Sequence, residues 1–431
     1  AFPPVRVEDY RDPLRGETPL AEVLKEAGYQ TAAFGSNVYL SSHFGYNRGF
    51  EVYQDYDERL AGGASRRLDK WLTTLARPII KRNNRLYRLS LDLYYSMGSL
   101  KRHPPYMTAG ETNRQPLAWL KKAPQKFFLW VHYMDTHPPF MPPKAYSGRF
   151  LPVATRTMSV RDQVKLSNKW MRNTDAMSSE EMELFLSLYD ANIRYMDDAV
   201  RDLLDYLRQA GRDRDTVLIV AADHGKQLGD RHRPWRGYTL YEYVIRVPLI
   251  VYYPPRLGSA VVRQLVSTLD IAPTLVDIMG VPLPESFRGK SLLPVMGGQN
   301  VREGPVVCMA FDAISGERSF AYRTETWKLI AQDDGKRELY NLARDPEEAV
   351  NLWDAERDTG KALEGKIQEY VRLREEERSN LLRVQMGHRL YGVAAGLRPP
   401  LVHPQEHGRP IAGVRAAGAR LDREEGVRGV V

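Results

Sequence analysis

Only one cysteine, Cys308, occurs among the 431 residues of the sequence. A single thiol excludes an intrachain disulfide and leaves the redox compartment undecided. Cys308 lies in the apolar run GPVVCMAFD, which is typical of a β-strand and contains no histidine or basic residue. We therefore expect a buried, unreactive thiol at this position rather than a nucleophile.

Long apolar stretches are also missing from the sequence. No run approaches the roughly 18 residues that a membrane-spanning helix needs. The first residue is Ala1 rather than methionine, and no signal peptide follows it. The expectation is that the chain begins after a processing site or is a fragment of a longer protein. The compartment and the oligomeric state stay open on the sequence alone.

The charge is unbalanced toward basic residues. Lysine and arginine number 62 against 54 aspartates and glutamates, which gives a formal net charge of +8 and a pI near 9.3. Such a balance is compatible with an anionic partner, such as nucleic acid, an acidic membrane surface or an anionic substrate, but solvated surface and insertion charge is the favoured interpretation. No basic motif of a known nucleic-acid-binding module is present, so nucleic acid is not expected as a partner.

Part of the basic excess lies in residues 61–105, which are rich in leucine and tyrosine and helical in spacing. We interpret this stretch as an amphipathic helical insertion packed on its own domain. Contact with a membrane surface or an anionic substrate is the alternative, with weaker support.

Apolar runs and helical patterns alternate through the first 300 residues, which predicts an α/β domain with a mainly parallel sheet and helices on both of its faces. Thr18 is expected to cap the first helix and Gly28 to end it. The run from Lys126 to Met134 is apolar on both sides, as in a buried parallel strand. The predicted order is helix 20–27, strand 31–35, helix 112–122, strand 126–134, a long helix ending at Gly211, strands 216–225 and 246–254, and helix 267–280.

A different pattern begins near residue 301. Short strands separated by turn signals predict a small antiparallel sheet over 301–385, with a closing helix at 361–376. Residues 386–431 are rich in Gly, Arg and Pro without periodicity, which predicts a disordered tail. The predicted strands are VVCMAF, RSFAYRT, WKLIAQ and RELYNL.

Two predicted strands end in polar clusters. Asp135-Thr136-His137 follows the strand at 126–134, and Asp223-His224-Gly225 lies at the end of the strand at 216–225. Ligands gather beyond the carboxyl ends of parallel strands, and a carboxylate with an imidazole can bind a divalent metal or move a proton. Taken alone, an Asp-His-Gly turn is more often a helix cap. His132 is interpreted as a core or supporting histidine, and His232 as a solvated one.

The order of several segments resembles the sulfatase family of the alkaline phosphatase superfamily, over about residues 18–354. The resemblance implies a large α/β domain followed by a small C-terminal sheet packed against it. The segments that carry it are LAEVLKEAGYQTAAFGSN, RGFEVYQ, FFLWVHYMDTHPPF, LYDANIRYMDD, TVLIVAADHGKQLGD, TLYEYVIRVPLIVYYP, STLDIAPTLVDIMGVPLP, RGKSLLP and WKLI…ELYNLARDPEEAVNL.

The resemblance also implies roles for single residues. Asp223 and His224 match the family pair that binds a divalent cation, usually Ca²⁺, with Mg²⁺ or Mn²⁺ as alternatives. His137 matches the histidine that contacts the sulfate group and assists the leaving oxygen. Arg236 stands nearest the position of the family's sulfate-binding lysine or histidines. A guanidinium can bind an oxyanion through two hydrogen bonds but does not readily donate a proton, and a surface arginine is the alternative.

The sequence departs from the family in three places. The Cys/Ser-x-Pro-x-Arg motif, whose cysteine or serine becomes formylglycine, is absent; in family order it would stand before Pro19, with a paired aspartate ligand, so both are expected upstream of Ala1. Lys226 stands where an acidic residue is usual. Gly35-Ser36-Asn37-Val38 stands where many members have Gly-Lys-Trp-His.

Three functions are compatible with these residues. The leading one is metal-dependent hydrolysis of sulfate esters, with turnover not expected from the 431-residue chain itself. Hydrolysis or transfer of a phosphate or phosphonate ester by the same superfamily is the second. An inactive homologue or fragment that binds anions is the third. Aryl, carbohydrate and lipid sulfates are all handled on this scaffold, so the substrate stays open.

Overall fold

The computed structural model describes residues 18–37, 40, 42, 45–55, 106–151, 158–172, 177–228, 239–299, 304–311, 318–394 and 429–430. The basic stretch at 61–105, His232 and Arg236 lie outside these residues. No helix in the described part of the chain is both long and apolar enough to cross a membrane.

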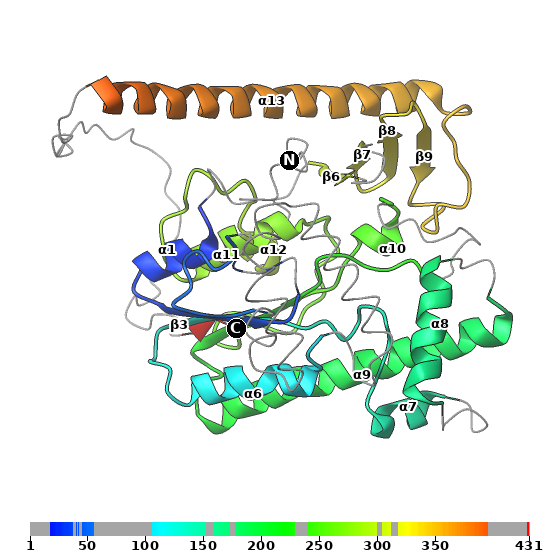
Figure 1. The fold of residues 1–431 in the computed structure, drawn as a ribbon. Coiled ribbons are helices and arrows are strands. Elements are labelled where there is room, and N and C mark those ends of the chain that lie inside the picture. Colours follow the sequence, from blue (N-terminus) through cyan, green and yellow to red (C-terminus); the bar gives the residue numbers. More distant parts are fainter. Residues whose placement is uncertain are drawn as a thin grey trace.

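A six-stranded sheet lies at the centre of the fold (Figure 1). Its strands pair in parallel, except that β5 runs antiparallel to β4 at one edge. The mainly parallel sheet expected from the alternating pattern is therefore confirmed. In spatial order the strands are β2 (Val52–Gln54), β1 (Gln30–Gly35), β3 (Phe127–His132), β10 (Gly429–Val430), β4 (Thr216–Ala221) and β5 (Leu249–Tyr252).

Helices cover both faces of this sheet, because β3 carries apolar side chains on both of its sides. Phe128 packs into one cluster with Leu24 and Leu275, on the side of α1 (Leu20–Glu26) and α11 (Ile271–Ile278). Phe127 and Leu129 belong to the cluster of the opposite face, with side chains of α6 (Ala109–Leu120) and α9 (Ser179–Gln209). Figure 1 shows α1 and α11 above the sheet and α6 and α9 below it.

Local signals account for most of these helix ends. Capping boxes start α6 at Thr108 and α9 at Ser178, and Gly211 follows α9 with a φ of +66°. Gly28, with a φ of +85°, ends α1 as expected. The expected cap at Thr18 is wrong, because Pro19 occupies the N-cap of α1 and no side chain caps it.

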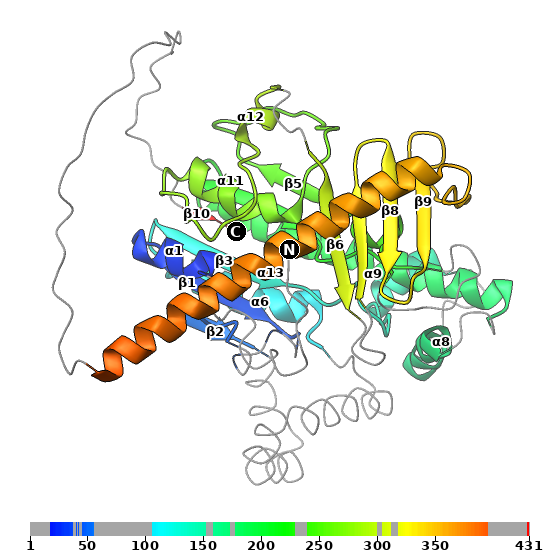
Figure 2. The same ribbon diagram turned by 90° about the horizontal axis from the view of Figure 1, so that it is seen from above.

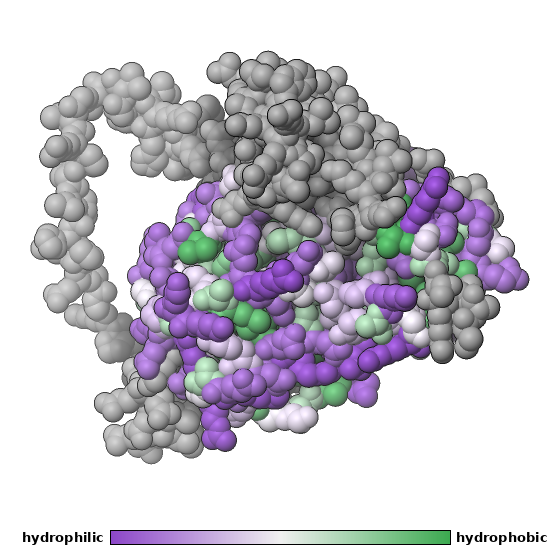
Figure 3. All heavy atoms as spheres, turned by 60° about the horizontal axis from the view of Figure 1, so that its bottom comes forward, coloured by the Kyte–Doolittle hydropathy of each residue, from purple (hydrophilic) through white to green (hydrophobic). Residues whose placement is uncertain are grey.

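Further helices and one turn of 3₁₀ helix complete the described elements of the first part of the chain. The helix α8 packs on α9 through a cluster that includes Phe140, Trp170 and Phe185. The outward side of α9 carries ion pairs such as Arg201 with Asp197 and Asp198, and hydrophilic residues predominate on this face of the molecule (Figure 3). These elements are α7 (Lys144–Phe150), α8 (Val160–Arg172), α10 (Glu242–Ile245), η8 (Thr268–Asp270) and α12 (Leu293–Met296).

The predicted small sheet is present as four antiparallel strands: β6 (Val306–Phe311), β7 (Arg318–Arg323), β8 (Trp327–Gln332) and β9 (Arg337–Asn341). The helix α13 (Arg357–Ala394) crosses one face of it, where Ile367 packs on Leu329 and Leu339 (Figure 2). Cys308 lies on the other face, against a cluster that contains Leu240, and burial raises the pKa of its thiol. This agrees with an unreactive cysteine.

The tail predicted from residue 386 is wrong in two places. Helix α13 continues to Ala394, because glycines alone do not stop it and the next proline in the sequence is Pro399. Gly429 and Val430 form β10, which pairs in parallel with the first residues of both β3 and β4. A pair of residues from the end of the chain thus lies in the middle of the central sheet.

A buried ion cluster joins the small sheet to the α/β part. The ammonium of Lys328, on β8, is fully buried and lies 3.1 Å from Glu242 Oε1 and 2.7 Å from Glu348 Oε1. Arg323 adds a contact of 3.4 Å to Glu242 Oε2. Burying these charges is tolerated because each has an opposite partner. Since Glu242 begins α10, the small sheet fixes the position of that helix.

Candidate active site

The two predicted polar clusters lie together beyond the carboxyl ends of β3 and β4. The charges of His224 and of Asp223 contribute to the pKa of His137, so the ends of the two strands are within electrostatic reach of one another. The pKa of His132, the last residue of β3, also responds to Asp223 and His224. Strands far apart in the sequence therefore deliver their polar ends to one place, as parallel topology requires.

Asp223 and His224 present free ligand atoms to solvent. The His224 Nδ1–H donates to the carbonyl of Gly225 at 2.7 Å, because a carbonyl oxygen can only accept. Its Nε2 is thereby left with a lone pair, and it lies 3.9 Å from Asp223 Oδ2. The other oxygen of Asp223 accepts from the His224 amide at 2.9 Å. One imidazole nitrogen and one carboxylate oxygen are thus available together as ligands.

The turn that holds this pair is fixed by α10. The Gly225 amide donates to the carbonyl of Val244 at 2.7 Å. A Cβ on Gly225 would lie 2.1 Å from the carbonyl oxygen of Tyr243, so only glycine fits this approach. The ion cluster at Lys328 therefore helps to position the candidate ligands indirectly. Lys328 contacts Glu242, Glu242 begins α10, and α10 accepts the hydrogen bond from the turn.

Part of His137 is exposed to solvent, but surrounding protein atoms desolvate its imidazole ring. Its Nδ1–H donates to the carbonyl of Pro138 at 2.8 Å, so Nε2 is free to accept a proton. Burial lowers the pKa of His137 below its ordinary value, and the positive charge of Lys226 lowers it further. The ring is therefore neutral at pH 7 in the absence of a bound anion.

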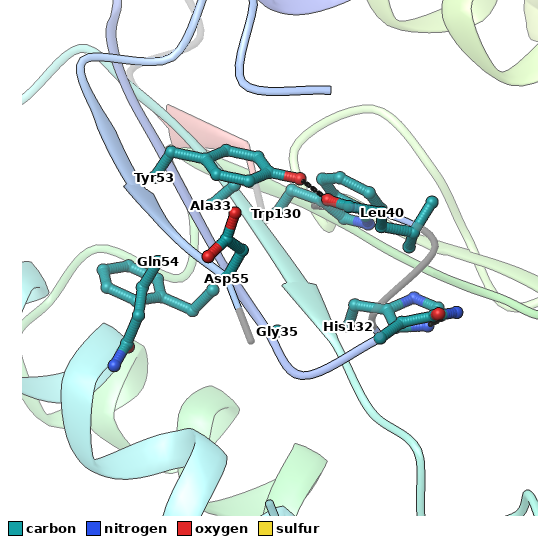
Figure 4. A pocket seen from close by; sticks show the side chains of 10 residues that line it. Ala33, Gly35, Leu40, Tyr53, Gln54, Asp55, Trp130 and His132 are labelled. Atoms are coloured by element: carbon teal, nitrogen blue, oxygen red, sulfur yellow. Dashed lines mark hydrogen bonds between the residues drawn. The ribbon is translucent and has the colours of Figure 1, made fainter. Parts of the chain in front are cut away.

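A small hollow, open to solvent, lies at the ends of β1 and β3 and has His132 in its lining (Figure 4). His132 Nε2 lies 3.4 Å from Asn37 Nδ2, and Trp130 and Tyr53 contribute aromatic walls. Burial lowers the pKa of His132. Its position supports the sequence interpretation of a supporting histidine, and it also places the unusual Gly-Ser-Asn segment at the edge of the site.

Asp135 is buried, with 2% of its surface exposed. Its Oδ1 accepts from the Ala109 amide at 3.0 Å, while Oδ2 has no partner in the described part of the chain. Burial raises the pKa of Asp135 to about 7. The carboxyl group therefore anchors the start of α6 and carries a proton over much of the acidic range.

This raised pKa makes stability depend on pH. Between pH ~4 and pH ~7 the folded chain holds a proton at Asp135 that the unfolded chain has lost, so stability falls as pH rises through this window. Asp135→Asn keeps the acceptor for Ala109 but does not titrate. We expect the loss of unfolding free energy from pH 5 to pH 8 to shrink by up to about 3 kcal/mol, since about two pKa units of the shift lie in this range and each is worth roughly 1.4 kcal/mol.

Urea unfolding at the two pH values measures this difference. Asp190→Asn, an exposed aspartate on α9, is the matched control and should leave the pH slope unchanged. An equal slope in wild type and Asp135→Asn would show that Asp135 is ionised in the folded chain.

The described residues contain no group of three or more His, Cys, Asp or Glu side chains arranged around one point. Asp223 and His224 thus fit a divalent cation as part of a ligand set rather than as the whole of one. Arg236, the predicted sulfate-binding residue, lies outside the described residues, so its position is not tested.

Comparison with known families decides the identity of this fold. The sulfatase family matches residues 2–281, which is more than half of the chain. The chain belongs to the sulfatase family. A second family, described as N-sulphoglucosamine sulphohydrolase, C-terminal, matches residues 231–375 and covers the small antiparallel sheet. The resemblance to the sulfatase family, which was inferred from the order of the sequence segments, is confirmed.

Curated sulfatase relatives are similar over part of their length. Arylsulfatase K of Bos taurus is 31% identical over 190 residues, 42% of this chain and 35% of that protein. Arylsulfatase K of Rattus norvegicus is 25% identical over 370 residues, 78% of this chain and 61% of that protein. Choline-sulfatase of Rhizobium meliloti (strain 1021) is 33% identical over 167 residues, 38% of this chain and 32% of that protein. The chain spans between 32% and 61% of these relatives.

Solved structures confirm the sulfatase fold. The phosphonate monoester hydrolase of Agrobacterium radiobacter superposes with a TM-score of 0.58 at 19% identity, covering 83% of this chain and 80% of that one. A protein solved with its substrate D-glucosamine-2-N,6-O-disulfate gives 0.54 at 18% identity, covering 85% and 83%. At these identities the likeness concerns the fold alone.

Two features of this sulfatase-type site were not predicted. Trp170, on α8, lies under the ammonium of Lys226 at 5.7 Å from the ring centroid. The apolar positions of residues 160–172 were a readable helical signal, but nothing local indicates that this helix packs near β4. The hydrogen bond between Gly225 and Val244 joins residues 19 apart in sequence and has no local signal at all.

Proposed function

We propose that this sulfatase-family protein hydrolyses sulfate esters with the help of a divalent cation. The observation that carries the proposal is that Asp223, His224 and His137 lie together at the ends of β3 and β4, as a hydrolytic site of this kind needs. Asp223 and His224 bind the cation, His137 acts on the leaving oxygen, and Arg236 binds the sulfate group. The Cys/Ser-x-Pro-x-Arg motif that supplies the formylglycine nucleophile in the family is not among the 431 residues.

The ligand chemistry supports Ca²⁺ first, with Mg²⁺ or Mn²⁺ as alternatives. The exposed carboxylate of Asp223 suits a hard cation, and His224 Nε2 is the free nitrogen of its ring. The Nδ1–H donated to Gly225 fixes the tautomer that leaves this nitrogen available. When bound, such a cation polarises the non-bridging oxygens of the ester.

His137 has the geometry for proton transfer through Nε2. Its lowered pKa keeps the ring neutral in the empty site, and the negative charge of a bound sulfate ester favours the protonated form. A proton taken up at Nε2 is then given to the leaving oxygen. The bond from Nδ1 to the Pro138 carbonyl holds the ring in one orientation during both steps.

The substrate class is proposed from the relatives. Arylsulfatases, a choline-sulfatase and a protein solved with a disulfated glucosamine are all similar to this chain, so we propose a small-molecule or carbohydrate sulfate ester. Phosphonate monoester hydrolases share the fold, which keeps phosphate and phosphonate esters as the second candidate.

The test is an assay of the protein expressed from its complete coding sequence, with 4-nitrophenyl sulfate and 4-nitrophenyl phenylphosphonate as parallel substrates. We expect faster hydrolysis of the sulfate ester, loss of activity with EDTA and recovery with Ca²⁺. Faster hydrolysis of the phosphonate ester would favour the second candidate. A folded protein that hydrolyses neither ester would establish an inactive homologue.

A further inference from the structure

Lys226 lies beside the candidate site in an unusual setting. It follows β4 three residues after Asp223, and its side chain is partly buried. Its ammonium stands 5.7 Å from the ring centroid of Trp170, which is 1% exposed and belongs to α8. The indole face therefore lies against the ammonium as a cation–π partner, which is a weaker compensation for its charge than a carboxylate.

Within the described part of the chain this ammonium has no counter-ion. Lys226 makes no ion pair and no hydrogen bond there, whereas the buried Lys328 contacts both Glu242 and Glu348. Removing a cation from water without an opposite charge is costly, and the ring face of Trp170 compensates this cost only in part. A site that keeps such a charge gains free energy when an anion binds there.

The ammonium acts on the proposed catalytic centre. Its charge is the second cause of the lowered pKa of His137, so it lies close to that ring. Once a divalent cation binds Asp223, the ends of β3 and β4 carry a positive charge, which an oxyanion can match.

We infer that Lys226 binds the substrate's sulfate group, donating a hydrogen bond from its ammonium to a non-bridging oxygen. The inference rests on the proposed function for the identity of the anion. It gives a role to a positively charged residue at a position where the family usually has an acidic one. It also places a second sulfate-binding cation, in addition to the proposed Arg236, at the end of β4, where its ammonium lies over Trp170.

Calorimetric titration of the 431-residue chain with inorganic sulfate at pH ~7 tests this role. Lys226→Met keeps an unbranched stem over Trp170 and removes the charge, so we expect sulfate affinity to fall about tenfold or more. Lys226→Arg should stay within about threefold of wild type, since a cation remains. Lys165→Met, an exposed lysine on the same helix as Trp170, is the matched control and should bind as wild type does.

Thermal melts establish that the variants are folded. A folded Lys226→Met chain that binds sulfate as tightly as wild type would overturn the inference, and so would the absence of saturable binding by wild type. Failure of the proposed function looks different: sulfate would bind in a Lys226-dependent way while the full protein hydrolysed no sulfate ester.

Discussion

Asp223→Asn is expected to lower kcat/KM for a sulfate ester by about 1000-fold or more. The substitution keeps the shape of the side chain but removes the negative charge that we propose as a ligand of the divalent cation. Charge stabilisation by such a cation is worth several kcal/mol in the transition state, and each ~1.36 kcal/mol is a factor of ten in rate. The structure favours a local effect, since Asp223 is exposed and its Oδ1 accepts from the neighbouring amide.

Steady-state kinetics of the full protein measure the expected fall in kcat/KM. Calorimetric titration with Ca²⁺ measures the expected loss of cation binding. His224→Ala should weaken Ca²⁺ binding as well, because it removes the free Nε2. Asp205→Asn, an exposed aspartate paired with Arg208 on α9, is the matched control and should change neither quantity. Wild-type Ca²⁺ affinity in a folded Asp223→Asn protein would exclude this residue as a ligand.

The sequence predicted the parts of the fold that local chemistry determines. The apolar run at 126–134 and the apolar start of TVLIVAADHG are the strands β3 and β4, because a strand buried on both faces favours such runs. The four strands of the small sheet were predicted by their alternation and turns. Because polar residues follow β3 and β4 directly, the residue order alone was enough to assign His137, Asp223 and His224 to one edge of the sheet.

Other parts depend on contacts that sequence does not encode locally. From the sequence, Lys226 was interpreted only as a departure from the family. Its packing on Trp170 and its lack of a counter-ion among the described residues depend on the tertiary structure, which the local sequence does not reveal. The continuation of α13 past residue 386 was missed because the glycines there suggested a loop, although no proline stops the helix before 399. Pairing of β10 between β3 and β4 depends on two residues that no periodicity marks.

The small sheet also supports the site, in addition to the central strands β3 and β4 that carry the candidate residues. Lys328 fixes Glu242, Glu242 starts α10, and the Val244 carbonyl of α10 accepts from Gly225. A chain of one buried ion cluster and one backbone hydrogen bond therefore sets the position of the turn that carries the candidate ligands. The small C-terminal sheet thus has a structural connection to the candidate ligands although it contributes none of them.

Gly225→Ala tests that support most directly. The added Cβ would lie 2.1 Å from the Tyr243 carbonyl oxygen and 3.1 Å from its carbon, and backbone atoms cannot rotate away as a side chain does. The turn at 223–225 must shift by about 1 Å to reach van der Waals distance, and a displacement of that size costs on the order of 100-fold in rate. We expect kcat/KM to fall by that factor, with stability lowered by about 1–3 kcal/mol.

The matched control is Gly258→Ala, since a Cβ there meets no atom within 4 Å. It should leave both activity and urea unfolding close to wild type. Affinity for Ca²⁺ separates the causes: a shifted turn weakens the binding of the cation, whereas general loss of stability leaves the affinity of the folded fraction unchanged. Full activity and wild-type stability in Gly225→Ala would show that α10 yields to the turn, and that the small sheet does not position Asp223 and His224.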